Sequence, residues 1–475
     1  MFDHLTATET RPTAVVVAVQ FPNVSDAELA SSMEELERLA KTLGLDPVGR
    51  LTQRRGGLAT GIVLGEGKLK ELAEWTGGSG IVPMYVKPGS RKADGKDDEN
   101  DEDDDEDDEA VEPDGDPAYA VEPGDKPAPR ASVVLVDHDL TPTQQRNLER
   151  ATGVDVLDRT AVIVEIFHRH AKTREARLQV EIARLKYLAP RLREGGGGGD
   201  RVRGGVGGKG AGETSIELDR RRIRDRIAEL RNELSQIEGG SKIRRDRRSD
   251  LPTVALVGYT NAGKSSLMRA LTSTDVYVAD KLFATLDTTI RRLQPPTEPP
   301  ILVSDTVGFI KKLPHDLVAS FRSTLDEAGD ADLLLHVVDA SDAAHADQLA
   351  VTRAVLTEIG ADTVPTWILL NKIDRVDDEA RAALMERYPG ALQLSAKARD
   401  DVEALRDRLI EQFAGKLEET ELDVPWTAQR LVHDIHERTT VLAEEHHDHG
   451  TRLTIRAPSR IVSELREALA TATAS

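Results

Sequence analysis

The sequence predicts an α/β protein whose central domain has a doubly wound, mostly parallel sheet. A small α/β domain with an antiparallel helical hairpin precedes it, and a small α+β domain follows it. Three observations predict this class. Short apolar runs alternate with helix-length amphipathic segments, as a parallel sheet requires. A glycine-rich loop joins the apolar run 254–257 to the start of a helix, and two heptad-spaced apolar seams lie upstream of that loop.

Composition limits the possible classes of protein. The chain has 475 residues, no cysteine and a net charge of −21, and this length suits about three domains. No apolar run reaches the roughly 18 residues that a membrane-spanning helix needs. Nothing near the N-terminus has the form of a signal peptide. We therefore expect a cytoplasmic protein without a membrane span.

Charge is distributed unevenly along the chain. Residues 94–126 hold 18 acidic residues against two lysines, whereas residues 169–248 hold 22 basic residues against 12 acidic ones. A basic segment within an acidic protein indicates that this segment has its own, anionic partner.

The N-terminal domain is expected to span residues 1–158. Residues from about 88 to 130 are rich in Asp, Glu, Pro and Gly, a composition that cannot bury enough apolar surface to fold. Strand and helix patterns resume after them, so we expect a disordered acidic insertion inside one domain. The expected strands are 13–19, 61–64, 132–137 and 154–158, and the expected helices are 26–42, 68–75 and 141–151.

Residues 159–250 are expected to form the helical hairpin, because apolar residues recur there at alternating intervals of three and four. The link between the two helices, residues 195–212, contains eleven glycines and should be mobile. An Arg-rich linker, 242–248, follows the second helix. The two seams are Leu178, Ile182, Leu185, Ala189 and Leu192, and Ile223, Ile227, Leu230, Leu234 and Ile237.

The central domain is expected over residues 251–416 and begins with a strand, a loop and a helix. The loop from Gly258 to Ser265 fits G-x-x-x-x-G-K-[ST]. In such a loop, backbone N–H groups converge on phosphates at a helix N-terminus. Lys264 supplies a positive charge to the β- and γ-phosphates, and Ser265 offers its hydroxyl to Mg²⁺.

Three further motifs follow apolar runs and are therefore expected at the carboxyl ends of strands. Asp-Thr-Val-Gly at 305–308 gives a carboxylate for the Mg²⁺ shell and a small residue beside a γ-phosphate. Asn-Lys-Ile-Asp at 371–374 presents Asp374 to the guanine ring nitrogens, which adenine cannot match. Ser-Ala-Lys at 395–397 would close over the base. The four motifs together predict a site for GTP and Mg²⁺.

The C-terminal domain is expected over residues 421–475. A helix at 428–437 precedes a hairpin whose turn lies near 448–450, and a strand at 452–456 leads into a last helix that ends near residue 470.

Short motifs outside the acidic insertion carry a family resemblance; they lie at 140–148, 158–160, 173–175, 178–180, 212–214, 219–223 and 257–265. In these motifs the chain resembles the HflX family of ribosome-associated GTPases, whereas the acidic insertion departs from the family pattern. The resemblance implies that the N-terminal domain and hairpin bind the large ribosomal subunit, with the glycine-rich loop reaching ribosomal RNA. It also maps the first switch onto 283–287, with Thr285 as a Mg²⁺ ligand and Thr288 and Thr289 as alternatives.

The expected site combines these motifs with the implied switch. Lys264, Thr285 and Asn261 are the candidate catalytic residues, and Ser265 and Thr285 are the candidate metal ligands. The residues expected to contact the nucleotide are Gly258, Tyr259, Thr260, Asn261, Ala262, Gly263, Lys264, Ser265, Phe283, Ala284, Thr285, Leu286, Asp287, Asp305, Thr306, Val307, Gly308, Asn371, Lys372, Ile373, Asp374, Ser395, Ala396 and Lys397.

Two functions remain open. The first is a monomeric GTPase that acts on a ribosomal particle and has no DNA partner. The second is a GTP-regulated scaffold whose coiled segment binds a protein or membrane surface. Many GTPases place Gln after D-x-x-G to orient water, but here the residue is Phe309. Asn261 is a candidate for holding an activating K⁺, and its alternative role is that of a turn residue.

Overall fold

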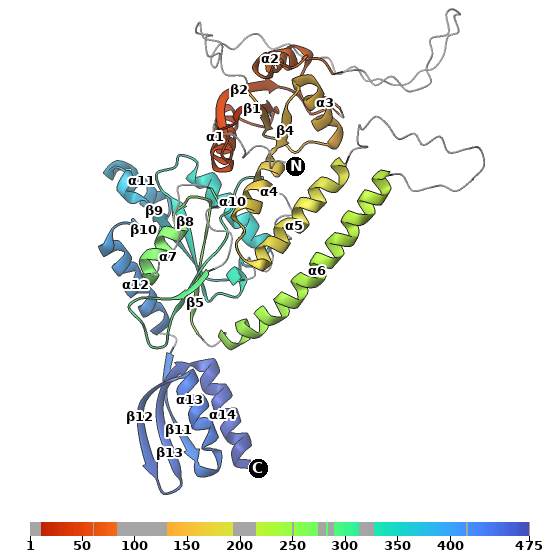
Figure 1. The fold of residues 1–475 in the computed structure, drawn as a ribbon. Helices are drawn as coiled ribbons and strands as arrows, with labels where there is room; N and C mark the ends of the chain where they lie inside the picture. The colour runs from red at the N-terminus through yellow and green to blue at the C-terminus, as the bar shows by residue number, and fades with distance from the viewer. Residues whose placement is uncertain are drawn as a thin grey trace, which may run out of the picture. The chain divides into compact units, whose positions relative to one another are not determined.

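The structure is a computed structural model that describes residues 11–59, 61–82, 131–192, 215–248, 251–273, 282–283, 289–312, 327–414 and 417–474. The chain divides into two compact units, Met1–Ile163 and Val164–Ser475 (Figure 1). Within the described part of the chain, none of the helices is both long enough and apolar enough to span a bilayer.

The first unit contains a four-stranded parallel sheet with the order β2-β1-β3-β4. Helices α1 and α3 begin with capping residues: the side chain of Ser25 accepts from the backbone N–H of Glu28, and that of Thr141 accepts from the backbone N–H of Gln144. The elements are β1 (Thr13–Gln20), α1 (Asp26–Leu43), β2 (Asp46–Arg54), α2 (Glu66–Thr76), β3 (Val133–Val136), α3 (Pro142–Thr152) and β4 (Asp155–Asp158).

The sheet order shows where the acidic segment lies. Strand β1 pairs with β2 on one side and with β3 on the other, so strands from before and after residues 83–130 share one sheet. This pairing is what an insertion within a single domain requires, and the bounds of that domain stay a prediction. The insertion itself is outside the described residues, and its expected disorder stays a prediction.

The second strand of this sheet was predicted in the wrong place. Residues 61–64 form no strand, and β2 lies at Asp46–Arg54 instead. Val63 and Leu64 are apolar because they pack into the core from a loop. Among the described strands, β2 pairs with β1 alone, and such an edge strand tolerates Pro47 and has no need of a continuous apolar run.

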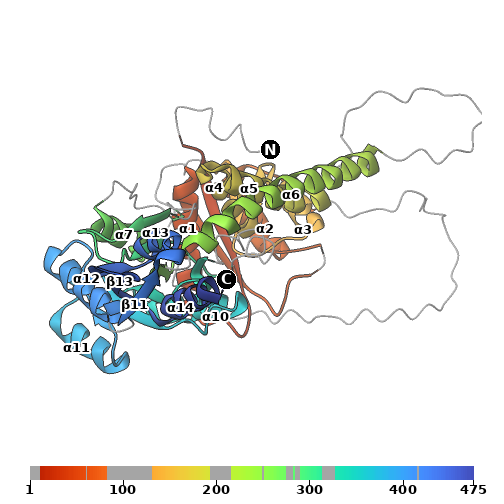
Figure 2. The ribbon, with the colours of Figure 1, turned by 90° about the horizontal axis from the view of Figure 1, so that it is seen from below.

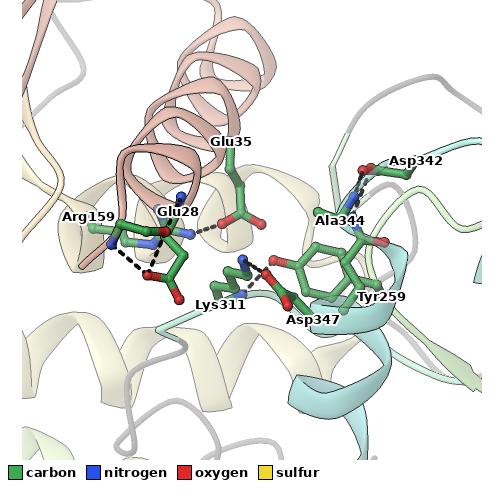
Figure 3. Close-up of polar contacts among 10 residues, drawn as sticks. Glu28, Glu35, Arg159, Tyr259, Lys311, Asp342, Ala344 and Asp347 are labelled. Carbon is green, nitrogen blue, oxygen red and sulfur yellow. Dashed lines mark hydrogen bonds and ion pairs between the residues drawn. The ribbon is translucent and has the colours of Figure 1, made fainter. Parts of the chain in front are cut away.

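A buried ionic cluster marks the end of this sheet, where α4 (Arg159–His170) begins. Arg159 is only 1% exposed. Its guanidinium donates to the carboxylate of Glu35 on α1 and, at 2.8 Å, to Asp137 after β3; the Glu35 contact is drawn in Figure 3. Asp137 also accepts from the hydroxyl of Ser32 at 2.6 Å. Helix α4 is buried on every side from Ala161 to Phe167.

The predicted hairpin is formed by α5 (Arg174–Leu188) and α6 (Ser215–Arg248), which lie side by side in both views (Figure 1, Figure 2). The heptad prediction is confirmed for most of the seam: Leu178, Ile182 and Leu230 form its buried centre. Two details differ. Ala189 lies in a 3₁₀ turn that ends the seam, and the expected linker 242–248 is the helical end of α6. The glycine-rich loop 195–212 is outside the described residues.

The central domain has a six-stranded sheet with the order β10-β9-β8-β5-β7-β6, parallel except for β6. Helices α7 and α12 pack on one face and α10 on the other, so the predicted doubly wound sheet is confirmed. Its elements are β5 (Thr253–Gly258), α7 (Lys264–Thr272), β6 (Thr289–Arg292), β7 (Leu302–Asp305), β8 (Leu333–Asp339), α10 (His345–Glu358), β9 (Thr366–Asn371), α11 (Asp378–Arg387), β10 (Leu392–Gln393) and α12 (Arg399–Ala414).

The C-terminal part is an antiparallel sheet, β11-β13-β12, with α13 and α14 packed on its apolar face. The predicted hairpin turn, between β12 and β13, is confirmed. Strand β11 was missed because its apolar residues, Leu422 and Val424, alternate with carboxylates. The elements are β11 (Leu417–Pro425), α13 (Arg430–Arg438), β12 (Thr440–His447), β13 (Gly450–Pro458) and α14 (Ser459–Ala474).

The buried ionic cluster yields a stability prediction. Replacing Arg159 by Leu should lower the free energy of unfolding by about 3–5 kcal/mol, because two carboxylates lose their buried cation. The matched control is Lys68→Ala, which removes the exposed pair with Glu71 and should cost at most about 1 kcal/mol. Chemical denaturation of both variants measures the difference. Equal, small losses would show that the cluster does not stabilise the unit.

Candidate nucleotide site

The glycine-rich loop connects β5 to α7 and is shaped by two glycines. Gly258 has φ +146° and Gly263 has φ +100°, conformations that favour glycine. Space is also limiting, since a Cβ on Gly263 would lie 2.2 Å from Nδ2 of Asn371. The loop therefore delivers its backbone N–H groups to the N-terminus of α7, where an anion is stabilised.

Lys264, the first residue of α7, turns its side chain back over the loop. Its Nζ donates to the carbonyl oxygens of Gly258 at 2.9 Å and Tyr259 at 2.8 Å. Burial lowers the pKa of Lys264 to about 8, while the charge of Asp305 acts in the opposite direction. The ammonium group thus lies inside the loop that is shaped to receive phosphates.

Ser265 lies in the first turn of α7, and Asp305 is the last residue of β7. The Ser265 hydroxyl donates to Oδ2 of Asp305 at 2.7 Å, and β5 and β7 are paired. A hydroxyl and a carboxylate are the hard oxygen donors that Mg²⁺ prefers, so these residues fit the ion. Mg²⁺ would neutralise charge between phosphates there. The other expected ligand, Thr285, lies outside the described residues, as do Ala284, Leu286 and Asp287.

The segment after Asp305 contacts the loop through its backbone. Thr260 N–H donates to Phe309 O at 2.8 Å, and Phe309 N–H donates to Gly258 O at 3.2 Å. The Thr306 hydroxyl bonds the carbonyl of Leu256 at 2.7 Å, so its described contact is structural. The Phe309 ring is buried in the apolar cluster between the sheet and α10, which leaves no polar group at the position where many GTPases have Gln.

The Asn-Lys-Ile-Asp motif joins the loop to the Ser-Ala-Lys segment. Asn371 Nδ2 donates to Ala262 O at 2.8 Å, and Asn371 Oδ1 accepts from the N–H of Ala396 at 3.0 Å. Lys372 Nζ donates to Asn261 O at 2.7 Å. Asn371 therefore connects the glycine-rich loop to the Ser-Ala-Lys segment, and Lys372 makes a second contact with the glycine-rich loop.

Asp374 is the exposed carboxylate of this motif. Its Oδ1 accepts from the Ser395 hydroxyl at 2.7 Å. This hydrogen bond is the main reason that the pKa of Asp374 lies below its usual value. The backbone N–H of Lys397 in turn donates to the Ser395 hydroxyl at 3.3 Å. Ile373 is buried in the core, so its side chain contributes packing. An ionised, exposed acceptor is the group that the ring N1–H and the exocyclic amino group of guanine require.

Comparison with known proteins agrees with this geometry. Family models match residues 30–82 and 126–168 (GTP-binding GTPase N-terminal), 170–248 (GTP-binding GTPase Middle Region) and 253–372 (50S ribosome-binding GTPase). GTPase HflX of Gluconacetobacter diazotrophicus is 54% identical over 459 residues, which cover 97% of this chain and 98% of that protein. The chain belongs to the HflX family of GTPases.

Two further relatives extend the comparison. GTPase HflX of Escherichia coli K12 is 38% identical over 435 residues, covering 91% of this chain and 89% of that protein. A crystal structure of a GTP-binding protein from Sulfolobus solfataricus in complex with GDP is 23% identical, with a TM-score of 0.40, and covers 84% of this chain and 98% of that one. The N-terminal family model stops at residue 82 and resumes at 126, so it leaves the acidic insertion of this HflX-family chain unmatched.

The structure adds residues that the motifs did not reveal. Lys372 Nζ also donates to Oδ2 of Asp339 at 2.7 Å. Asp339 is the last residue of β8, which lies between β5 and β9 in the sheet. The rule that site residues lie at the carboxyl ends of parallel strands therefore also applies to Asp339. The hydroxyl of Tyr259 accepts from the N–H of Lys311 at 2.8 Å, and Lys311 Nζ pairs with Asp347 at 3.1 Å (Figure 3). No sequence pattern indicates these two contacts.

Phe283 is a described residue of the expected first switch, and its contact with the nucleotide stays a prediction. Its ring packs edge-on against Phe167 of α4, with ring centroids 4.5 Å apart and an interplanar angle of 88°. Both rings are buried. The described side chain at the start of the first switch therefore contacts the helix that precedes the hairpin.

Guanine recognition can be tested at Asp374. Asp374→Asn should weaken GTP binding by roughly 2–3 kcal/mol, because two charge-assisted hydrogen bonds lose their acceptor. Xanthosine triphosphate, whose O2 can accept from the new amide, should bind the variant better than GTP does. The matched control is Asp377→Asn, since Asp377 caps α11 and Asn is an equally good cap. Competition binding measures both; equal GTP affinities would contradict the assignment.

Proposed function

We propose that this GTPase binds the large ribosomal subunit through its helical hairpin and acts there in ribosome splitting, assembly or recycling. The observation that carries the proposal is the combination of a complete set of guanine-nucleotide motifs with a basic hairpin in one acidic chain. The description of the matched family model, a 50S ribosome-binding GTPase, supports the same partner. Because ribosomes are cytoplasmic particles, the proposed location is the cytoplasm, and the proposed form is a monomer.

The exposed face of α6 suits ribosomal RNA. Arg220, Arg222 and Arg224 are exposed, and Arg222 also pairs with Asp219 at 3.0 Å. Arginines on a rigid helix recognise phosphates and RNA shape more than base edges. We propose that residues 195–212, which link α5 to α6 in the sequence, extend the contact to RNA.

The proposal also assigns roles to the residues of the nucleotide site. Ser265, with Asp305 beside it, would hold Mg²⁺, and Thr285 is the proposed second protein ligand. Lys264 would meet the β- and γ-phosphates, and Asp374 would meet guanine. GTP is then the ligand whose hydrolysis ends the ribosome-bound state.

Ribosome binding can be tested by sedimentation. Replacing Arg220, Arg222 and Arg224 by Gln should weaken association with large subunits most strongly at low salt. The slope of log affinity against log salt should fall by about 2–3, since each lost phosphate contact contributes nearly one. The matched control neutralises three exposed arginines of α11 and α12, Arg387, Arg399 and Arg408. No salt-dependent, RNase-sensitive sedimentation of the parent would favour the scaffold function instead.

Hydrolysis should be slow in the isolated protein, because the buried Phe309 ring cannot orient water. We propose that K⁺ beside Asn261, or the ribosome, supplies what is missing; a cation there would stabilise developing charge. Asn261 has φ +62°, a conformation that Asn tolerates and that also fits the turn-residue alternative.

Single-turnover hydrolysis in matched K⁺ and Na⁺, with and without large subunits, separates these roles. Asn261→Gly is the informative variant, because Gly adopts the positive φ without strain while the side-chain amide is removed. We expect K⁺ to accelerate the parent and not the variant. Identical hydrolysis rates in K⁺ and Na⁺ for both proteins would show that K⁺ has no part in the mechanism. A fast rate in Na⁺ without ribosomes would show that the isolated protein already has a group that replaces Gln.

A further inference from the structure

The side chain of Thr260 is enclosed between the phosphate loop and Gly308. Thr260 is 7% exposed. A Cβ on Gly308 would lie 2.9 Å from Cγ2 of Thr260, 3.0 Å from its Cα and 3.1 Å from Nζ of Lys264. Thr260, Lys264 and Gly308 are therefore immediate neighbours. Gly308 is the residue whose backbone approaches a γ-phosphate in this class of site, so Thr260 lies at the γ-phosphate end of the loop.

The Thr260 hydroxyl is unusual among the buried threonines that the structure describes. Its Oγ1 is buried and has no hydrogen-bond partner among the described residues. By contrast, Thr152, Thr272 and Thr352 each donate to a carbonyl one helical turn earlier, at 2.8–2.9 Å. A buried hydroxyl without a partner destabilises the fold, and valine would fill the same space without that cost.

The sequence motifs leave two roles near the γ-phosphate without a polar side chain. One is to orient the attacking water, and the other is to donate a hydrogen bond to the γ-phosphate oxygens. The residue after Gly308 is Phe309, whose ring lies in the apolar core. Lys264 provides one cation to the phosphates, and the loop provides backbone N–H groups. No side-chain donor from the D-x-x-G segment is available on the described residues to match the charge that develops on the γ-phosphate oxygens.

We propose that Thr260 is a further catalytic residue, whose hydroxyl donates a hydrogen bond to a γ-phosphate oxygen as GTP is cleaved. The proposal rests on the proposed position of GTP in this site. In the reaction, a water oxygen forms a bond to the γ-phosphorus and the bond from that phosphorus to the bridging oxygen breaks. The electron pair passes to the β-phosphate, one proton of the water passes to a phosphate oxygen, and the other stays on the oxygen that is now bonded to the γ-phosphorus. Thr260 keeps its own proton throughout.

This role explains why threonine is present at a position where its hydroxyl is costly. A donor that is fixed before the reaction, and lacks a partner in the resting fold, needs no rearrangement to meet developing charge. Its methyl group packs on Gly308 and fixes the hydroxyl in place. The competing explanation is that only this packing matters, and it predicts that valine would serve as well.

The test compares Thr260→Val, which keeps the packing, with Thr260→Ser, which keeps the hydroxyl. We expect Thr260→Val to slow single-turnover GTP hydrolysis about 10- to 100-fold, because one donor to the transition state is lost. Its GDP affinity should be unchanged, and its melting temperature without nucleotide should equal or exceed that of the parent. Thr260→Ser should keep most of the parent rate.

The control is Thr352→Val, since the Thr352 hydroxyl is also buried but bonds the carbonyl of Gln348; its hydrolysis rate should match the parent. A parent-like rate for Thr260→Val, or an equal loss in Thr260→Ser or Thr352→Val, would overturn the proposal. Thr260→Ala gives the same comparison should Thr260→Val fail to bind GDP. A parent protein that does not bind GTP would contradict the proposed function instead.

Discussion

The side-chain amide of Asn371 is the interaction on which the nucleotide site depends. Its two polar atoms bond the carbonyl of Ala262 and the N–H of Ala396, so the phosphate loop and the base-binding segment share one anchor. Gly263 can approach this amide only because it has no Cβ. The two segments proposed to bind the phosphates and the base are therefore fixed relative to each other by one buried residue, and either segment would lose this anchor without it.

Much of this site could be predicted, because parallel strands bring their carboxyl ends to one edge of the sheet. The order of strands places the ends of β5, β7, β8 and β9 next to one another, and three of these ends carry the predicted motifs. Asp339, at the end of β8, follows from the same rule once the order is known. Motifs thus identify the chemistry, while topology identifies which residues meet.

The rest could not be predicted for a physical reason. The contact of Tyr259 with Lys311 joins residues 52 positions apart, and the Phe167–Phe283 pair joins still more distant ones. Such contacts leave no local period in the sequence. Strands β2 and β11 were misplaced or missed because each is paired on one side only, where burial is incomplete and the apolar pattern is weak.

The length of α6 has a mechanical consequence. The helix contains 34 residues, which corresponds to about 51 Å at 1.5 Å per residue, and only four residues separate Arg248 from the start of β5 at Thr253. A helix of this length acts as a lever arm. A tilt of about 10° at its C-terminal end would carry its N-terminal end through about 9 Å. A shift of about an ångström at the start of β5, the strand that leads into the glycine-rich loop, would thus become a displacement of several ångströms at the N-terminal end of α6.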